Sequence, residues 1–218
     1  DTASDTGSSN IDNITMDTTP TFTGTAAAGT TVTLQAGSTE IGSATATNGN
    51  WSITSSDLAP GTYSIKATAT DTLGNPSAES GVLAVTIDTT APVLQTINRQ
   101  VPTTLNTNAT TVTWRVTFDG GIFGIDASDF LLTTIEGTVV GSIGSVSTVS
   151  PAVYDVAVTG VSGQGRLRLD LKSSGTGIAD LAGNTLASGG FTTGAIFAVG
   201  TSSVFDTLAL APGTMQSV

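Results

Sequence analysis

The stretch Tyr63-Ser-Ile-Lys-Ala-Thr-Ala-Thr70, followed by Asp71-Thr-Leu-Gly-Asn75, decides the fold class of this chain. In its first eight residues, apolar side chains occupy every second position and hydroxyl or amine side chains lie between them. A period of two is typical of a strand with one buried face. The Asp, Gly and Asn residues that follow are turn formers. A strand that ends in a turn predicts an all-β fold.

Strand and turn signals continue on both sides of this stretch. Asn48-Gly49 is a two-residue hairpin signal, and Leu58-Ala-Pro-Gly-Thr-Tyr63 marks a corner. About six or seven short strands fit into residues 17–90, and this density is typical of a β-sandwich. No segment has a convincing helical period.

A pair of Asp-bearing motifs occurs twice. Asp17-Thr-Thr-Pro20 precedes the Asp71–Asn75 loop, and Asp88-Thr-Thr-Ala-Pro92 precedes Asp180-Leu-Ala-Gly-Asn184. Each pair brackets a set of short strands, so the chain is predicted to hold two tandem domains. We expect residues 1–16 to be a linker or calcium loop, 17–90 the first sandwich, 91–200 a second, larger sandwich, and 201–218 a tail or the start of a neighbouring unit.

The second set of strands alternates more regularly. In Val112–Phe118 and Leu167–Leu171 the apolar side chains fall on one face, which places Asp170 on the outer face. Trp51 and Trp114 fall on inward faces and are expected in the two cores. The stretch from Phe191 to Val199 is predicted to be the last strand.

The composition excludes several classes of function. Charged residues make up 11% of the chain, and the formal net charge is −11. Nucleic acid and anionic lipid would both be repelled. The chain has no Cys and no His, which rules out thiol catalysis, disulfides and Ser-His-Asp triads. We therefore expect a non-enzymatic protein that binds no nucleic acid and does not insert into membranes. We also expect it to be a monomer.

The repeated acidic motifs are candidate calcium ligands. Calcium takes six to eight oxygen ligands from carboxylates, amides, backbone carbonyls and water. If each domain has its termini at opposite ends, the late loop lies at the end where the chain enters, so Asp71 and Asn75 should lie near Asp17. The alternative is that Asp, Asn and Gly simply form turns. The candidate ligands are Asp5, Asp12, Asn13, Asp17, Asp71, Asn75, Asp88, Asp126, Asp129, Asp180 and Asn184. By the same reasoning, Asp180 and Asn184 should lie near Asp88.

Several of these stretches resemble the bacterial immunoglobulin-like repeats of giant surface adhesins, including RTX-type and biofilm-associated proteins. The resemblance is carried by residues 5–15 (DTGSSNIDNIT), Asp17-Thr-Thr-Pro-Thr-Phe-Thr-Gly24, Asn48-Gly-Asn-Trp-Ser52, Leu58-Ala-Pro-Gly-Thr-Tyr63, Ala67-Thr-Ala-Thr-Asp-Thr-Leu-Gly-Asn75 and Val85-Thr-Ile-Asp-Thr-Thr-Ala-Pro92. Residues 93–199 resemble a longer companion repeat. The resemblance implies an elongated tandem of two immunoglobulin-like β-sandwiches, exported to the bacterial cell surface and often stiffened by calcium.

We therefore expect a non-catalytic extender, or stalk, of a large extracellular adhesin, with calcium as its cofactor and neighbouring repeats of the same long chain as its partners. Two other functions fit the sequence. The second domain could bind a glycan, a protein or a surface through its longer loops. The chain could also be an accessory domain of a secreted hydrolase. It has neither an initiator Met nor a signal peptide, and we expect it to be a fragment of a longer protein.

Overall fold

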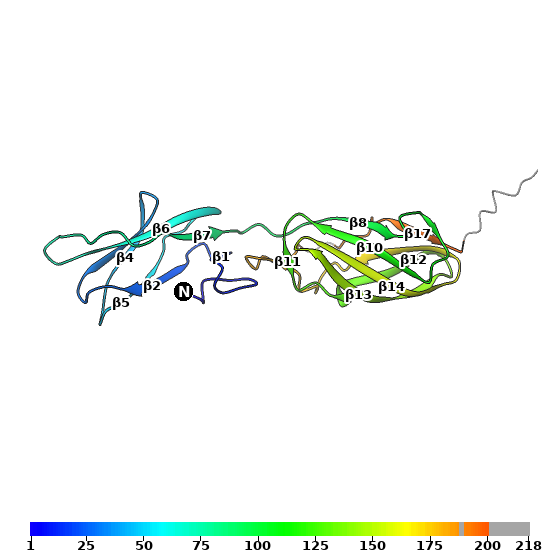
Figure 1. Ribbon diagram of the computed structural model, residues 1–218, viewed down its shortest axis with the longest axis horizontal. Coiled ribbons are helices and arrows are strands. Elements are labelled where there is room, and N and C mark those ends of the chain that lie inside the picture. Colours follow the sequence, from blue (N-terminus) through cyan, green and yellow to red (C-terminus); the bar gives the residue numbers. More distant parts are fainter. Residues whose placement is uncertain (188–189, 201–218) are drawn as a thin grey trace, which may run out of the picture. The chain divides into compact units, whose positions relative to one another are not determined.

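The computed structural model describes residues 1–187 and 190–200, and these residues form two compact units (Figure 1). The first unit comprises Asp1–Val93, Gly120–Gly124 and Gly177–Ala187. The second comprises Leu94–Asp119, Ile125–Thr176 and the described residues after Ala187. Residues 201–218, expected to be a tail or the start of another unit, lie outside the described residues. No helix in the described part of the chain is long and apolar enough to cross a membrane.

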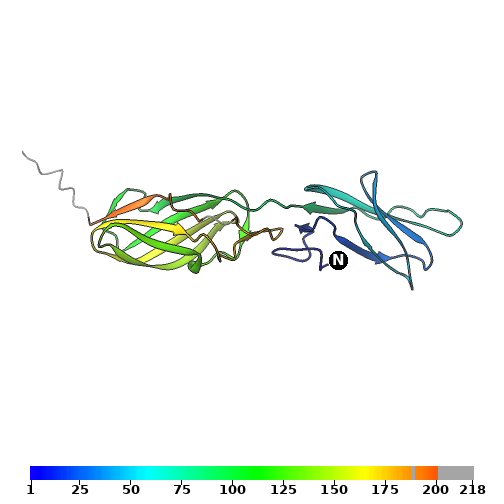
Figure 2. The ribbon, with the colours of Figure 1, turned by 180° about the vertical axis from the view of Figure 1, so that it is seen from behind.

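The first unit is a sandwich of two layers (Figures 1 and 2). One layer is a five-stranded sheet in the order β1-β7-β6-β3-β4, and the other is the two-stranded sheet β2-β5. A small ladder, β11-β16, also belongs to this unit. The strands are β1 (Ile14–Thr15), β2 (Thr21–Thr25), β3 (Thr31–Ala36), β4 (Thr39–Thr45), β5 (Asn50–Thr54), β6 (Gly61–Thr70), β7 (Leu83–Ile87), β11 (Ile122–Phe123) and β16 (Ala179–Asp180).

The strand order of the first unit is that of an immunoglobulin-like sandwich. β6 lies antiparallel between β3 and β7, and β1 runs parallel to the free edge of β7. β2 and β5 form the opposing layer. This arrangement confirms the fold class predicted from the period-two pattern, because alternating apolar residues can be buried only between two such layers.

Two turns predicted from the sequence are present in the first unit. Asn48 (φ 53°) and Gly49 (φ 85°) form the tight turn, and Thr47 and Asn50 on either side exchange both backbone hydrogen bonds, at 2.8 and 3.0 Å. At the corner before β6, the hydroxyl of Tyr63 donates to the carbonyl oxygen of Ala59 at 2.8 Å. The chain changes layers between β4 and this turn, since β4 and β5 belong to different sheets and Thr47 already pairs with Asn50 of β5.

The core of the first unit is made of aliphatic side chains from both layers. Trp51, predicted to be a core residue, is only partly buried, and its indole ring lies against Gly24, where an added Cβ would be 2.4 Å from the ring. The buried core residues are Phe22, Val32, Leu34, Ile41, Ala46, Ile53, Leu58, Ile65, Val85 and Ile87.

The second unit contains two four-stranded sheets, in the orders β13-β14-β10-β8 and β12-β15-β17-β9. Trp114 is fully buried, as predicted, and packs edge-on against Phe197 with their ring centroids 4.8 Å apart. Its indole N–H donates to the carbonyl oxygen of Ala195 at 2.7 Å. The strands are β8 (Leu94–Val101), β9 (Asn106–Thr107), β10 (Thr111–Phe118), β12 (Phe130–Gly137), β13 (Val140–Ser150), β14 (Val153–Ser162), β15 (Gly165–Leu171) and β17 (Ile196–Val199).

Two details of the second unit differ from the prediction. Asp170 was expected on the exposed face of β15 but is buried, because it pairs with Arg168 and accepts a hydrogen bond from the hydroxyl of Thr133 at 2.6 Å. The last strand is Ile196–Val199, and Phe191 makes an isolated bridge with Leu171 instead of belonging to that strand. Alternation reveals which face a side chain takes, but it does not reveal which neighbours cover that face.

Candidate functional site

The two Asp–Gly–Asn loops of the sequence have the same geometry in the structure. Asp71 accepts hydrogen bonds from the backbone N–H of Asn75 at 2.8 Å and from its side-chain amide at 2.9 Å. Asp180 accepts the same two bonds from Asn184, at 2.9 and 3.0 Å. The hydrogen bond from the Asn75 side chain is the largest effect that lowers the pKa of Asp71 below its ordinary value. Each carboxylate is therefore satisfied inside its own loop, which is what the turn-forming alternative predicts.

The loop at Asp180 lies beside Asp88, as predicted. The side-chain amide of Asn184 donates to the backbone carbonyl oxygen of Asp88 at 2.8 Å. The carboxylate of Asp88 instead accepts a hydrogen bond from the backbone N–H of Thr90 at 2.9 Å. The side chain of Asn184 is thus bonded to the main chain of Asp88, and this bond connects the two motifs.

The predicted proximity of Asp71 and Asn75 to Asp17 is wrong. Asp17 follows β1, which runs parallel to β7 and ends beside Ile87, so Asp17 lies at the end of the unit where β7 ends. β6 is antiparallel to β7, with Gly61 opposite Ile87, so the last residue of β6 and the loop after it lie at the other end. The prediction assumed that the chain enters and leaves at opposite ends. The six strands from β2 to β7, an even number, return it to the end where it entered.

The acidic loop of the second unit caps a short 3₁₀ turn. Asp126 accepts a hydrogen bond from the backbone N–H of Ser128 at 2.6 Å and donates its own N–H to Asp129 at 2.7 Å. The bond from Ser128 lowers the pKa of Asp126, whereas burial raises the pKa of Asp129. These two residues are held by local capping bonds.

The first residues of the chain, expected to be a linker or calcium loop, pack within the first unit. We call residues 4–8 the N-terminal strap. The hydroxyl of Thr6 donates to the carbonyl oxygen of Ala182 at 2.7 Å, and the N–H of Ser8 donates to that of Leu181 at 3.2 Å. Gly7 lies so close that an added Cβ would be 2.0 Å from the Leu181 oxygen. The sequence gives no signal for this contact, because Ser, Thr and Gly are common throughout the chain.

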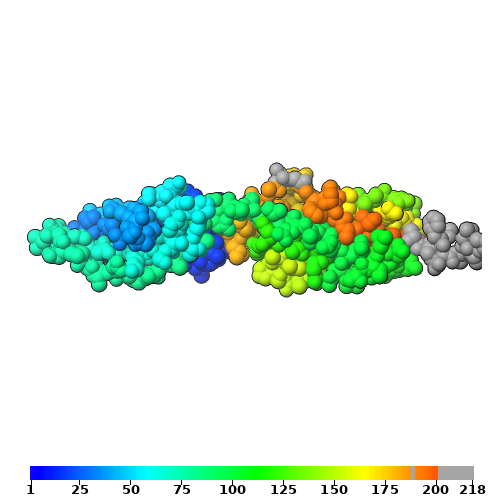
Figure 3. Space-filling view, turned by 90° about the horizontal axis from the view of Figure 1, so that it is seen from above, coloured from blue at the N-terminus to red at the C-terminus, as the bar shows by residue number. Residues whose placement is uncertain are grey.

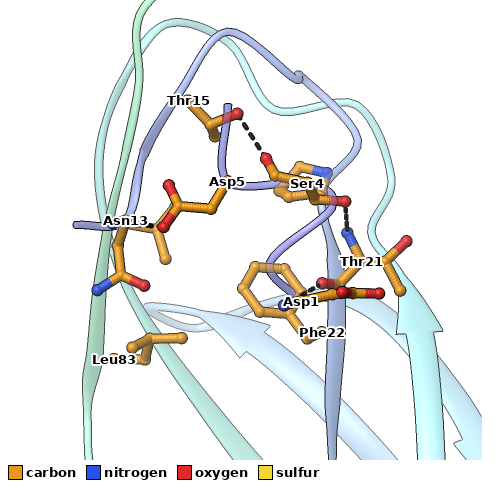
Figure 4. Close-up of a pocket in the computed structure, with 10 residues that line it drawn as sticks. Asp1, Ser4, Asp5, Asn13, Thr15, Thr21, Phe22 and Leu83 are labelled. Atoms are coloured by element: carbon orange, nitrogen blue, oxygen red, sulfur yellow. Dashed lines mark hydrogen bonds between the residues drawn. The ribbon is translucent and has the colours of Figure 1, made fainter. Parts of the chain in front are cut away.

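Asp5 of the strap lines a small cavity, of about 40 Å³, together with Asn13 (Figure 4). One carboxylate oxygen of Asp5 accepts the backbone N–H of Asn13 at 3.0 Å. The other oxygen, Oδ1, is buried and has no hydrogen-bond donor among the described residues. Asn13 itself has a left-handed backbone, with φ 60°. A buried carboxylate oxygen without a partner is costly, so a cation or a water molecule in this cavity would stabilise the unit.

The remaining predicted ligands near this end hold local turns. Asp12 is exposed and accepts the N–H of Ile14 at 3.1 Å. Asp17 accepts both the N–H and the hydroxyl of Thr19, at 2.9 and 3.2 Å. The residues that the structure describes contain no group of three or more His, Cys, Asp or Glu side chains that could hold a metal ion. A cation at any of the predicted positions would therefore depend on amide and carbonyl oxygens as well as carboxylates.

Comparison with known proteins gives one family and two similar structures. Residues 1–89 match the family model of the bacterial Ig-like domain. The fibronectin(III)-like modules of CbhA from Clostridium thermocellum are 21% identical, with a TM-score of 0.35 and coverage of 85% of this chain and 87% of that chain. The D0-D1 domain of intimin is 17% identical, with a TM-score of 0.26 and coverage of 83% and 94%. The search of curated proteins gave no match. The similarity to bacterial Ig-like domains thus covers most of the first unit.

Proposed function

We propose that this chain is a non-catalytic extender segment of a large bacterial cell-surface adhesin, stiffened by calcium. The observation that carries the proposal is the match of residues 1–89 to the bacterial Ig-like domain, on a unit with the strand order of an immunoglobulin-like sandwich. An extender holds another part of the protein at a distance and transmits force. This role requires stably folded units and does not require a reaction site. The absence of His and Cys from the sequence supports a non-catalytic role.

Contacts between distant parts of the chain support the mechanical part of the proposal. The bond from Thr6 to Ala182 joins residues 176 positions apart, and the bond from Asn184 to Asp88 joins residues 96 positions apart. Both contacts lie within the first unit. Segments far apart in the sequence must separate together before the unit can open, which raises the resistance of such a unit to local unfolding.

The cavity beside Asp5 is the best supported of the proposed calcium positions. Asp5 Oδ1 and the side-chain oxygen of Asn13 would hold the ion, and Asp1 and Ser4, which also line the cavity, carry further oxygens. Oxygen donors are the ligands that calcium prefers. A bound calcium ion would supply positive charge to a chain whose net charge is −11, and so reduce its internal repulsion.

Thermal unfolding in millimolar calcium and in EDTA tests this position. At a concentration one hundred times the dissociation constant, calcium should raise Tm by roughly 5–10 °C. Asp5→Asn keeps a hydrogen-bond acceptor for Asn13 but removes the charge, so most of the rise should disappear. Asp57→Asn, which removes one carboxylate at an exposed position, is the matched control and should retain the rise. An equal Tm in calcium and EDTA for the unmodified chain would rule out the calcium proposal.

One observation favours a binding module as the second candidate. A groove on the first unit is lined by Trp51, Asn50 and several hydroxyl side chains of β2, β4 and β5. An aromatic ring beside hydroxyl and amide groups offers an apolar surface and hydrogen-bonding groups to a sugar ring. The chain has two Trp residues and the other, Trp114, is fully buried, so fluorescence quenching by added saccharides reports on Trp51. Unchanged fluorescence across a panel of soluble saccharides would remove this candidate.

A further inference from the structure

The strap forms one wall of the cavity in which calcium is proposed to bind. Its residues Ser4 and Asp5 line the cavity together with Asn13 (Figure 4). The other walls belong to the sandwich and include the side chains of Phe22 and Val85, which are both buried. The carboxylate of Asp5 is therefore enclosed in this cavity only while the strap is in place.

The hydrogen bonds that fix the strap flank Asp5 on both sides. The carbonyl oxygen of Ser4 accepts a bond at 2.6 Å from the hydroxyl of Thr15, which is 2% exposed. On the other side, the hydroxyl of Thr6 donates to the carbonyl oxygen of Ala182 at 2.7 Å. Neighbouring Cα atoms are about 3.8 Å apart, so a movement of Thr6 away from Ala182 also displaces Asp5.

Burial of the Asp5 carboxylate opposes the closed position of the strap when the cavity holds no cation. Oδ1 is buried and has no hydrogen-bond donor among the described residues, whereas the other oxygen accepts the N–H of Asn13. A buried charge without a partner is unfavourable, and lifting the strap returns this charge to water. A cation beside Oδ1 removes the unfavourable term in the closed position only. Calcium should therefore bind the closed strap more tightly than the lifted strap.

The rest of the strap is a segment of low local stability. Gly7 and Ser8 are exposed, and atoms of the first residues, in dark blue, lie at the surface of the first unit (Figure 3). The N–H of Ser8 donates to the carbonyl oxygen of Leu181 at 3.2 Å, between two uncharged groups. Single bonds of this kind contribute little, so a bound ion can determine the position of the strap.

We propose that calcium binding at Asp5 and docking of the strap on Leu181 and Ala182 are coupled, so that the ion holds the strap closed. This inference rests on the calcium position proposed above and adds a regulated movement to it. Removal of calcium releases the strap and uncovers the two carbonyl oxygens. Coupling between two binding events is reciprocal, so a strap that cannot dock must bind calcium more weakly by the same factor.

Hydrogen exchange of the full chain, labelled with ¹⁵N, tests the effect of calcium on the strap. The N–H groups of Ser8 and Met16 are the reporters, because they donate to Leu181 and to the hydroxyl oxygen of Thr6. Both should exchange roughly fivefold or more slowly in saturating calcium than in EDTA at the same pH. The N–H of Asn50, bonded within the tight turn at 3.0 Å, is the internal control and should exchange equally in both.

Calorimetric titration with calcium chloride tests the reverse effect on the ion. Gly7 does not line the cavity, and Gly7→Val prevents docking because an added Cβ would be 2.0 Å from the Leu181 oxygen. This variant should raise the dissociation constant for calcium roughly fivefold or more. Gly29→Val is the matched control, since its φ is also positive but its Cβ would meet no atom within 4 Å, and its dissociation constant should be unchanged.

Thr6→Val provides a second variant that does not strain the backbone. It removes the hydroxyl that donates to Ala182 and should raise the dissociation constant in the same direction as Gly7→Val. A strap that is only structural would lower Tm in these variants and leave calcium affinity unaltered. Calcium binding without the change in affinity, or without slower exchange at Ser8, would overturn the coupling and leave the calcium position intact. No calcium binding to the unmodified chain would overturn both.

Discussion

The side-chain amide of Asn184 donates to the backbone carbonyl oxygen of Asp88, at 2.8 Å, and to the carboxylate of Asp180, at 3.0 Å. One amide group thus joins the late loop of the sequence to the residue that follows β7, 96 positions earlier. The loop at Asp71 has the same internal bond but no equivalent of the contact with Asp88. The two loops therefore provide a natural pair for measuring what the long-range bond contributes.

The first prediction concerns this pair. Asn184→Ala should lower the free energy of unfolding by about 1–3 kcal/mol, because it removes two hydrogen bonds and leaves a partly buried carbonyl without its donor. Asn75→Ala removes one bond in an exposed loop and should cost about 1 kcal/mol or less. Urea unfolding of both variants gives the comparison. An equal loss for the two variants would show that the bond to Asp88 contributes nothing.

The second prediction concerns the close approach of Gly7 to Leu181. Gly7→Ala should be destabilising for two reasons: its φ of 97° is unfavourable for alanine, and the new Cβ would be 2.0 Å from the Leu181 oxygen. Gly29→Ala is the matched control, since its φ is 85° and its Cβ would meet no atom within 4 Å. The control should cost about 1 kcal/mol, and Gly7→Ala about 1–3 kcal/mol more. Similar melting temperatures for the two variants would contradict the tight contact.

The third prediction concerns the buried carboxylate of Asp170. Asp170→Ala leaves the partly exposed guanidinium of Arg168 and the hydroxyl of Thr133 without their partner, and the loss of these charge-assisted hydrogen bonds should cost about 2–3 kcal/mol. Glu136→Ala breaks an exposed pair with Arg166 and should cost less than about 1 kcal/mol. Chemical unfolding of the two variants, compared with the unmodified chain, distinguishes the pair with a buried carboxylate from the exposed pair.

The fourth prediction concerns the pH dependence of stability at Asp129. Burial raises the pKa of this residue, so the folded state holds its proton more tightly than the unfolded state does. Its contribution to stability is present below the ordinary value of 3.8 and is lost as the pH rises through the raised pKa.

Asp129→Asn does not titrate and still offers an acceptor to the N–H of Asp126. The stability of this variant relative to the unmodified chain should therefore increase as the pH rises from about 3 to 7. Urea unfolding at both pH values provides the measurement. A difference that stays constant with pH, or that falls, would show that burial does not raise the pKa of Asp129.

Local pattern in the sequence determined the strands and the turns of this protein. The alternation in Thr111–Phe118 places Trp114 in the core, and Asn48-Gly49 forms the turn that its residue types demand. These features depend on neighbours one or two positions apart, because a side chain alternates faces along a strand and a tight turn is closed by local hydrogen bonds. The same is true of the carboxylate–amide bonds inside the two Asp–Gly–Asn loops.

Tertiary structure alone decided which of these local features meet. The loop at Asp71 lies far from Asp17 because an even number of strands returns the chain to the end where it entered. The strap reaches Ala182, and Asp170 is buried beside Arg168, through neighbours supplied by other segments. Such contacts depend on how the strands are ordered in the two layers. The alternation of residue types along a strand shows which face of the sheet each side chain takes. It does not show which residue of another segment will contact that side chain.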